Sequence, residues 1–336
     1  MIMGIDLIQI NEKHSIPKYK QIVNAIIKGI DDGKLSKGDH LPSINAICTR
    51  RNLSRDTVMM AYNELKAKGV LASFPGKGYY IESTNIETTH RIFLLFDEFN
   101  GFKEDLYNSF IKALQGKAAV EIYFHHFNRK VFESLIRENN GKYSSYVIMP
   151  TKFENILPLL QEINGKVFIL DQISEELKGH FPAVYQNFEN DVYNALVSGT
   201  EYLKKYKKVI MIYPGGKEPE GQFKGFLRFC KETKTEYELV QDIQYRKLNK
   251  GEVFIAISDD HLVKLVKEAK KEEYRLGEDI GLISYNDTSL KEVVGEGITT
   301  ISTDFKEMGK KLAELVLKKK NVQIENPSSL IIRSSL

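Results

Sequence analysis

The chain has 336 residues, more than one compact domain usually holds, so its length predicts two or three domains. Apolar residues make up 42% of it, charged residues 28%, and the mean hydropathy is -0.32; no apolar run is long enough for a membrane-spanning helix, which excludes that class. The net charge of +3 is unevenly distributed, because residues 1–82 hold nine lysines and three arginines against eight acidic residues.

Two cysteines, Cys48 and Cys230, lie far apart and outside any CxxC pattern. This argues against a disulfide framework and against a zinc site, and we expect neither a metal nor a cofactor. The first residues show no basic segment followed by a cleavage site, as a signal peptide would. We therefore expect a cytoplasmic protein.

Three helices are predicted in the first 70 residues. The first follows Pro17 and carries apolar residues at helical spacing as far as residue 30. Ser43 is a suitable N-cap for a second, short helix, and Ser54 for a third that ends at Gly69. The third contains the stripe of Val58, Ala61, Tyr62 and Leu65 that a core-facing helix requires.

A β-hairpin is predicted next, since "VLASF" and "YYIES" flank the turn "PGKG". Three helices and a hairpin form a winged helix-turn-helix domain over residues 1–82. The polar, aperiodic residues 83–90 are predicted to be a linker. Residues 91–336 form the remainder.

The remainder alternates short apolar runs with helical segments, which predicts an α/β fold with parallel sheets covered by helices on both faces. Polar residues gather where these runs end, as in "DEFN", "DQIS", "SDD" and "YND". Ligands of such sheets bind beyond the carboxyl ends of the strands. The predicted strands are "RIFLLFDEF", "AVEIYFHHF", "SSYVIMP", "KVFILDQ", "KVIMIYP", "EVFIAIS" and "IGLISYND".

Arg55 lies in the first turn of the third predicted helix, where the helix dipole disfavours a cation. A helix that enters the major groove of DNA leads with this turn, and an arginine there can bond guanine O6 and N7. Ser54 and Thr57 are then candidates for phosphate or base contacts, and Gly76 and Lys77 for wing contacts. The alternative is a solvated charge at a helix end.

Residues 16–81 closely resemble the winged-helix domain of the GntR family of bacterial regulators. The resemblance is carried by "P-x-Y-x-Q-I", "G-x-L-x-x-G-D-x-L-P-S", "S-R-x-T-V", "A-Y-x-x-L" and "G-x-G", in this order. It implies DNA contacts by Ser54, Arg55 and Thr57 and by the wing. It adds contacts by Ser43 and Asn45. The family often has arginine at the position of Asn45; an asparagine there can read adenine or contact a phosphate, but it cannot form the two bonds that arginine makes to guanine.

Residues 91–336 resemble the sugar-sensing domain of the LacI/GalR family, which has a two-lobed periplasmic-binding-protein-like fold. The resemblance rests on segments in the family's order, among them "GQFKGFLRFCKE" and "ITTISTDFKEMGKKLAELVLKK". Together the two parts resemble the AraR architecture. The lobes implied are residues 91–186 with 304–320, and residues 187–301 with 323–336.

The resemblance also implies effector contacts. Asp171 matches a carboxylate that accepts sugar hydroxyls, and Tyr185 an aromatic that packs on the sugar ring. Gln222 replaces the family's usual arginine, while Ser258 and Asn286 replace a common Asn and Asp.

Weaker candidates for effector contact are Asp97, Glu98, Phe99 and Asp259. A strand-end aspartate such as Asp171 is alternatively a helix or turn cap, and Tyr185 is alternatively a core residue. A monosaccharide effector is implied, with a pentose or deoxyhexose favoured because the arginine is missing.

These features predict a transcriptional repressor of a sugar-utilisation operon that binds double-stranded operator DNA as a homodimer and is released by its effector. An activator, or a sensor of a non-sugar molecule, fits the same residues. A more remote alternative is an α/β enzyme with an autoregulatory DNA-binding head. The sequence contains neither GxSxG, nor HExxH, nor a phosphate loop, so no catalytic residue is predicted and no enzymatic activity is expected.

Overall fold

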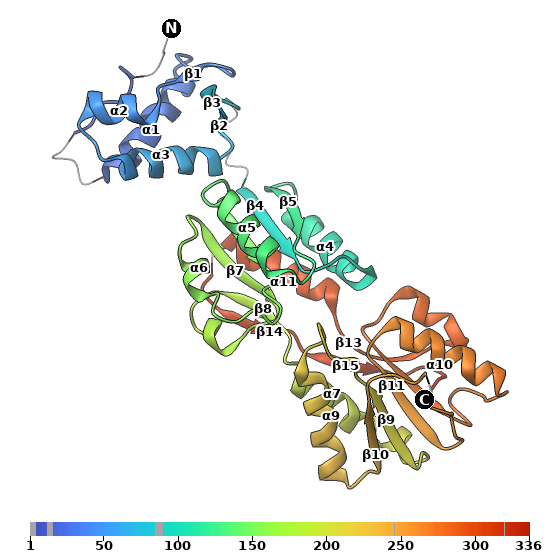
Figure 1. The fold of residues 1–336 in the computed structure, drawn as a ribbon. Coiled ribbons are helices and arrows are strands. Elements are labelled where there is room, and N and C mark those ends of the chain that lie inside the picture. Colours follow the sequence, from blue (N-terminus) through green and yellow to red (C-terminus); the bar gives the residue numbers. More distant parts are fainter. Residues whose placement is uncertain (1–4, 12–15, 85–89, 245, 319) are drawn as a thin grey trace. The chain divides into compact units, whose positions relative to one another are not determined.

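The structure is a computed structural model that describes residues 5–11, 16–84, 90–244, 246–318 and 320–336 (Figure 1). Residues 85–89, most of the predicted linker, lie outside this set. The chain forms two compact units, one of Met1–Glu98, Leu114–Ile148 and Asn155–Phe168, the other of Phe99–Ala113, Met149–Glu154 and Ile169–Leu336. No helix of the described residues has the length and apolar composition needed to cross a bilayer.

The N-terminal part consists of three helices and a small antiparallel sheet, as predicted (Figure 1). The sheet has the order β1-β3-β2, and the β2–β3 hairpin forms the wing. Apolar side chains from all three helices and the sheet form one core. The elements are α1 (Lys18–Asp31), β1 (His40–Leu41), α2 (Ile44–Arg51), α3 (Arg55–Ala67), β2 (Leu71–Phe74) and β3 (Gly78–Ile81).

The boundaries of α2 and α3 follow from local chemistry. Ser43 Oγ accepts a hydrogen bond from Ala46 N at 3.1 Å, and Ser54 Oγ accepts one from Thr57 N at 3.3 Å. Each satisfies an amide that the first helical turn leaves without an intrahelical partner. Gly69 follows the C-cap of α3 with φ of +67°, a conformation that glycine adopts without strain.

One six-stranded sheet has the order β14-β8-β7-β6-β4-β5. Its β4–β5, β4–β6, β7–β8 and β8–β14 pairings are parallel. The strands are β4 (His90–Phe96), β5 (Ala118–Phe124), β6 (Ser145–Ile148), β7 (Lys166–Asp171), β8 (Ala183–Tyr185) and β14 (Gln323–Glu325). The helices of these segments are α4 (Gly101–Leu114), α5 (Arg129–Asn139), α6 (Leu157–Gln161), the 3-10 turn η1 (Glu175–Leu177) and α11 (Phe305–Lys318).

The other six-stranded sheet has the order β10-β9-β11-β12-β13-β15 and is parallel except for β15. Its strands are β9 (Lys208–Ile212), β10 (Tyr237–Val240), β11 (Glu252–Ala256), β12 (Gly281–Tyr285), β13 (Thr299–Thr303) and β15 (Ser328–Ile331). Its helical segments are α7 (Phe188–Ser198), α8 (Thr200–Leu203), α9 (Glu220–Thr233), α10 (Asp259–Lys271), η2 (Ser289–Glu292) and η3 (Val294–Glu296).

The division between the sheets differs from the expected lobes at one place. Residues 323–325 were expected in the second lobe, but they form β14, which pairs with β8 of the first sheet. The chain then crosses, and only from Ser328 onward does it pair with β13. Strand pairing decides this assignment, and pairing is a non-local contact that the segment's own residues do not reveal.

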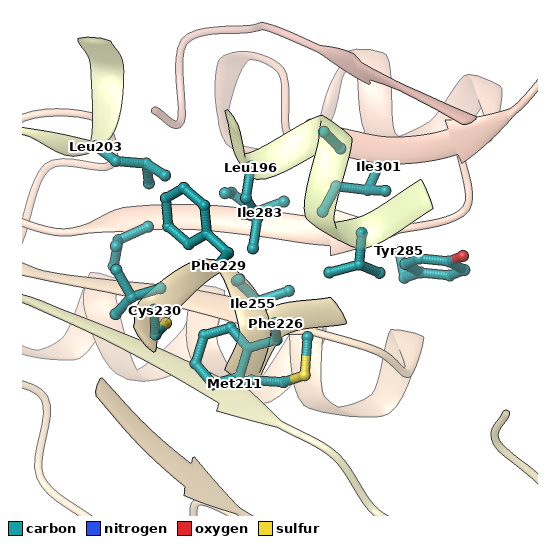
Figure 2. Close-up of a cluster of buried hydrophobic side chains, with 14 of the residues drawn as sticks. Leu196, Leu203, Met211, Phe226, Phe229, Cys230, Ile255, Ile283, Tyr285 and Ile301 are labelled. Carbon is teal, nitrogen blue, oxygen red and sulfur yellow. The ribbon is translucent and has the colours of Figure 1, made fainter. Parts of the chain in front are cut away.

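Alternate residues of β9, β11 and β12 face two different cores. Met211, Ile255 and Ile283 contact a cluster that includes Phe226 and Phe229 of α9 (Figure 2). Their neighbours Ile212, Phe254 and others pack with α10 on the opposite face. Because successive strand residues point to opposite faces, a sheet covered on both sides requires continuously apolar strands. This confirms the expectation drawn from the sequence.

Candidate functional site

The start of α3 presents polar side chains to solvent. Arg55 and Ser54 are exposed, and Ser54 Oγ lies 2.8 Å from Thr57 Oγ1. The hydrophobic stripe that includes Val58 and Tyr62 is fully buried on the other face. The helix is therefore anchored through one side, and its N-terminal turn is free to enter a groove of DNA.

Arg55 also contacts the second helix. Its Nη1 donates a long hydrogen bond of 3.4 Å to Oδ1 of Asn45. Asn45 is the second residue of α2 and is exposed. The two residues belong to different helices, yet they form one polar surface. The contact of Asn45 with adenine or a phosphate stays a prediction.

The wing tip is held in place by its own hairpin. Tyr80 OH donates to Lys77 O at 2.8 Å, and His40 Nε2 lies 3.0 Å from the same oxygen. Gly76 has φ of +73° with open space around its Cα, and the Lys77 side chain is exposed. The backbone of the wing tip is therefore fixed, and it carries an exposed lysine whose charge suits contact with a phosphate.

A cavity of about 530 Å³ lies in the unit that contains residues 169–336. It is lined by residues that follow β6 and β7, by the segment after β8 and by the first turns of α9. Both lysines and glutamates line it, together with neutral hydrogen-bonding groups. Its volume lies within the range of small-molecule sites. Lining residues include Thr151, Lys152, Gln172, Tyr185, Gln186 and Lys224.

Tyr185 is the predicted effector residue that lines this cavity. Asp171 is its register partner on β7 and has φ of +72°, outside the conformation usual for aspartate. Gln186 Nε2 donates to Asp171 Oδ1 at 2.6 Å, while Gln186 Oε1 is buried with no partner among the described residues. Gln186 thus connects the carboxylate of Asp171 to the cavity, because it both bonds Asp171 and lines the cavity.

Gln222 lies on the core side of α9. Gln222 is 2% exposed and lies beside Tyr285, whose pKa burial raises well above its ordinary value. Neither Gln222 Oε1 nor the Tyr285 hydroxyl has a hydrogen-bond partner among the described residues. The cavity is lined instead by Gly221 and Lys224 of the same helix. A one-residue step along a helix turns a side chain by 100°, so Gln222 faces the core while Gly221 lines the cavity.

A buried carboxylate lies near Tyr285. Asp191 of α7 is 2% exposed, and its Oδ1 accepts a hydrogen bond from Ser328 N at 2.8 Å. Its Oδ2 is buried with no partner among the described residues. Burial, with the nearby charge of Glu325, raises the pKa of Asp191 to about 6.

Three further predicted residues have structural partners. Ser258 is the N-cap of α10 and accepts from His261 N at 3.3 Å. Asp259 lies 2.8 Å from Nζ of Lys291, a lysine that is 3% exposed. Lys291 Nζ also donates to Asn286 O at 2.7 Å, and Asn286 has φ of +58°. Asn286 Oδ1 is buried with no partner within the described residues.

The remaining predicted residues, Asp97, Glu98 and Phe99, directly follow β4. Asp97 is 7% exposed, and its Oδ1 accepts from Glu98 N at 2.7 Å; Phe99 is 49% exposed. These residues are divided between the two compact units. The described residues contain no group of three or more His, Cys, Asp and Glu side chains suited to a metal ion.

Lys152, Gln172 and Lys224 line the cavity but were not predicted to bind. Gln172 directly follows Asp171 at the end of β7, so the rule that ligands sit beyond strand ends identifies it. Lys152 lies in the segment after the end of β6, so the same rule identifies it. Lys224 gives no such signal, because on an amphipathic helix its position resembles that of any solvated lysine.

Comparison with known proteins identifies the N-terminal part. Residues 18–81 match the model of the bacterial regulatory proteins of the gntR family. They form a gntR-family DNA-binding domain. The HTH-type transcriptional repressor YtrA of Bacillus subtilis is 36% identical over 83 residues, which are 25% of this chain and 63% of that protein. The chain thus spans less than two thirds of this relative's length, and the match lies with the gntR-family domain.

The C-terminal part has a different relationship. Residues 204–336 match the periplasmic binding protein-like domain. A transcription regulator like protein from Staphylococcus haemolyticus superposes with a TM-score of 0.62 at 14% identity, over 74% of this chain and 98% of that one. A periplasmic binding protein/LacI transcriptional regulator from Alkaliphilus metalliredigens, complexed with D-xylulofuranose, gives 0.59 at 13%, over 74% and 99%. These likenesses show the fold of the C-terminal part, so the chain has a gntR-family domain followed by a periplasmic binding protein-like α/β domain.

Proposed function

We propose that this chain is a cytoplasmic transcriptional repressor that binds operator DNA through its gntR-family domain and releases it when a monosaccharide binds the α/β domain. The observation that carries the proposal is the capped, exposed start of α3, where Arg55 and Asn45 form one polar surface above a buried core. Such a helix end suits base readout in the major groove. No catalytic role is proposed for any residue.

The cavity beside Tyr185 supports the sensor part of the proposal. It combines an aromatic ring with amides and charged groups, the mixture that hydroxyl-rich ligands require. The D-xylulofuranose bound by the Alkaliphilus neighbour makes a pentose a reasonable first candidate. By linkage, an effector that releases DNA must itself bind more weakly when the operator is bound.

We expect Tyr185→Ala to weaken monosaccharide binding roughly 3- to 10-fold, because a stacked aromatic contributes about 0.5–1.5 kcal/mol. Thermal-shift screening of pentoses, deoxyhexoses, hexoses and sugar phosphates on the full chain first identifies the sugar, and calorimetry then compares the variants. Tyr185→Phe retains the ring and should bind almost normally. Tyr202→Ala removes a 45% exposed tyrosine elsewhere and serves as the matched control.

Two outcomes would contradict the sensor proposal. One is a screen in which no sugar stabilises the chain. The other is a sugar that stabilises it but leaves operator affinity unchanged in gel-shift titrations. Tighter operator binding with the sugar would instead indicate that the effector promotes DNA binding.

The proposed repressor acts as a homodimer, since two heads are needed to occupy the two half-sites of a near-palindromic operator. One segment of the α/β domain supports self-association. Leu290 and Val293 are 73% and 72% exposed, and Val294 follows at 37%. Val263 of α10 is also exposed, and α10 is joined to this segment by the Asp259–Lys291 ion pair. A second copy of the chain would remove these aliphatic side chains from water.

We expect Val293→Glu to weaken dimerisation at least tenfold, because it brings a charge into an apolar contact and repeats it across the symmetry axis. Sedimentation velocity over a concentration series measures the dissociation constant. Val197→Glu, which alters a 43% exposed valine on α7, is the control and should leave the dimer intact. A wild-type chain that stays monomeric, or a Val293→Glu dimer of normal affinity, would refute this surface.

A further inference from the structure

The chain passes between the two six-stranded sheets at three places. It leaves β8 at Tyr185 and enters α7, it leaves β13 at Thr303 and enters α11, and it leaves β14 at Glu325 and enters β15. Each crossing is only one or two residues long. Any movement of one sheet against the other must bend all three segments.

One buried residue, Asn326, joins these crossings. Its backbone N–H donates to Tyr185 O at 2.7 Å, which ties the third crossing to the first. Its side-chain Nδ2 donates to Thr303 Oγ1 at 2.7 Å and to Asp304 O at 3.1 Å, which ties the third to the second. Thr303 Oγ1 in turn donates to Asn326 O at 2.9 Å.

The two backbone contacts need no particular side chain, but the side-chain contacts require an amide. Lys311 Nζ donates to Asn326 Oδ1 at 2.7 Å, and an ammonium group can only donate. Asp304 O can only accept, so the Nδ2 group must face it. Aspartate would satisfy Lys311 but would place an oxygen against the Asp304 carbonyl, and leucine would satisfy neither. With 2% of Asn326 exposed, water cannot replace a lost partner without a rearrangement.

We propose that Asn326 is the positioning residue that makes the three crossings bend as one unit. Without its side chain, the second crossing would be joined to the third only through the pairing of β13 with β15, and a change in one sheet would be transmitted less directly to the other. The proposed effector response rests on such a movement, but the coupling of the crossings is a property of the effector-free chain. It is therefore testable whether or not the sensor proposal holds.

The test is hydrogen–deuterium exchange, read by mass spectrometry, on the full chain without any ligand. Asn326→Ala is expected to speed amide exchange at least tenfold in all three crossings, residues 185–188, 303–305 and 325–328. The buried strands β11 and β12 should keep wild-type rates. Asn139→Ala is the matched control, because Asn139 is also buried, at 7% exposure, and also accepts from a lysine, Lys142. It should affect only the region of α5.

Thr303→Val gives a second test that does not depend on the folding of Asn326→Ala. It removes one hydroxyl while preserving the shape of the side chain. Through Asn326 it should also speed exchange at residues 185–188, which the Thr303 hydroxyl does not contact in the described hydrogen bonds. Faster exchange confined to the substituted segment, or a uniform increase across both sheets, would overturn the proposal and leave Asn326 as a stabilising residue alone.

Discussion

Replacing Arg55 by alanine is expected to weaken specific operator binding by about 1–3 kcal/mol, a loss of roughly 5- to 150-fold. The guanidinium lies at the exposed first turn of α3, and its Nη1 lies 3.4 Å from Asn45 Oδ1. A bidentate contact to guanine accounts for an effect of this size, whereas a single screened phosphate contact does not. Binding is measured with a duplex that the wild-type chain selects from random DNA.

Two further variants separate base readout from charge. Arg55→Lys keeps the positive charge but lacks the planar fork, so it should lose most of the specificity while keeping the salt dependence of binding. Arg129→Ala removes the same charge from α5, far along the chain from the helix-turn-helix, and should bind DNA normally. Equal affinity of Arg55→Ala and wild type for the selected duplex would exclude Arg55 from the readout.

Asn45 can be tested in the same assay. If it orients Arg55, the loss caused by Asn45→Ala should be smaller in the Arg55→Ala background than in the wild type, because the two residues share one interaction. If Asn45 reads a base by itself, the two losses should add.

The second large effect concerns Asp191. Burial is the main cause that raises its pKa to about 6 from the ordinary 3.8. Below the ordinary value the carboxyl is protonated in both the folded and the unfolded chain, and its contribution to stability is fully present. That contribution is lost as the pH rises through about 6, because the unfolded chain ionises more easily. A shift of about two pKa units corresponds to roughly 3 kcal/mol.

We therefore expect the free energy of unfolding of Asp191→Asn, relative to wild type, to increase by roughly 2 kcal/mol between pH 4 and pH 7, because part of the unfolded chain is already ionised at pH 4. Urea unfolding at several pH values measures this difference, in which the titration of all other groups cancels. If the stability difference between Asp191→Asn and wild type did not depend on pH, the pKa of Asp191 would not be raised in the folded chain.

Asp287→Asn is the matched control with the opposite sign. Burial opposes ionisation of Asp287, but Arg333, at 2.8 Å from both carboxylate oxygens, outweighs it and lowers the pKa below the ordinary value. Ionised Asp287 thus stabilises the folded chain at neutral pH, and this contribution is lost as the pH falls through its lowered pKa. Asp287→Asn should be less stable than wild type at pH 7, and the gap should narrow in acid.

Local chemistry allowed much of the N-terminal domain to be predicted. Ser43 and Ser54 cap the helices that their sequence positions indicated, and Gly69 ends α3 in a left-handed conformation. A cap satisfies amides two or three residues away, so the information lies within one short segment. The same holds for the continuous apolar strands, whose composition alone shows that both faces of a sheet are covered.

The effector region was less predictable, because its side chains are oriented by partners remote in sequence. Gln222 and Lys224 lie two residues apart on α9, yet one packs against Tyr285 and the other lines the cavity. Asp259 is paired with Lys291, 32 positions later. Nothing near either residue in the sequence specifies that ion pair.

By itself, the sequence determined the class of each part, the caps and wing of the N-terminal domain and the strand ends at which polar residues gather. Only the tertiary structure decided which sheet receives β14, which face of α9 meets the cavity, and that Asn326 joins three crossings. The physical reason is the range of the interactions. Caps and periodicity act within a few residues, whereas pairing, burial and shared hydrogen bonds depend on segments that only folding brings together.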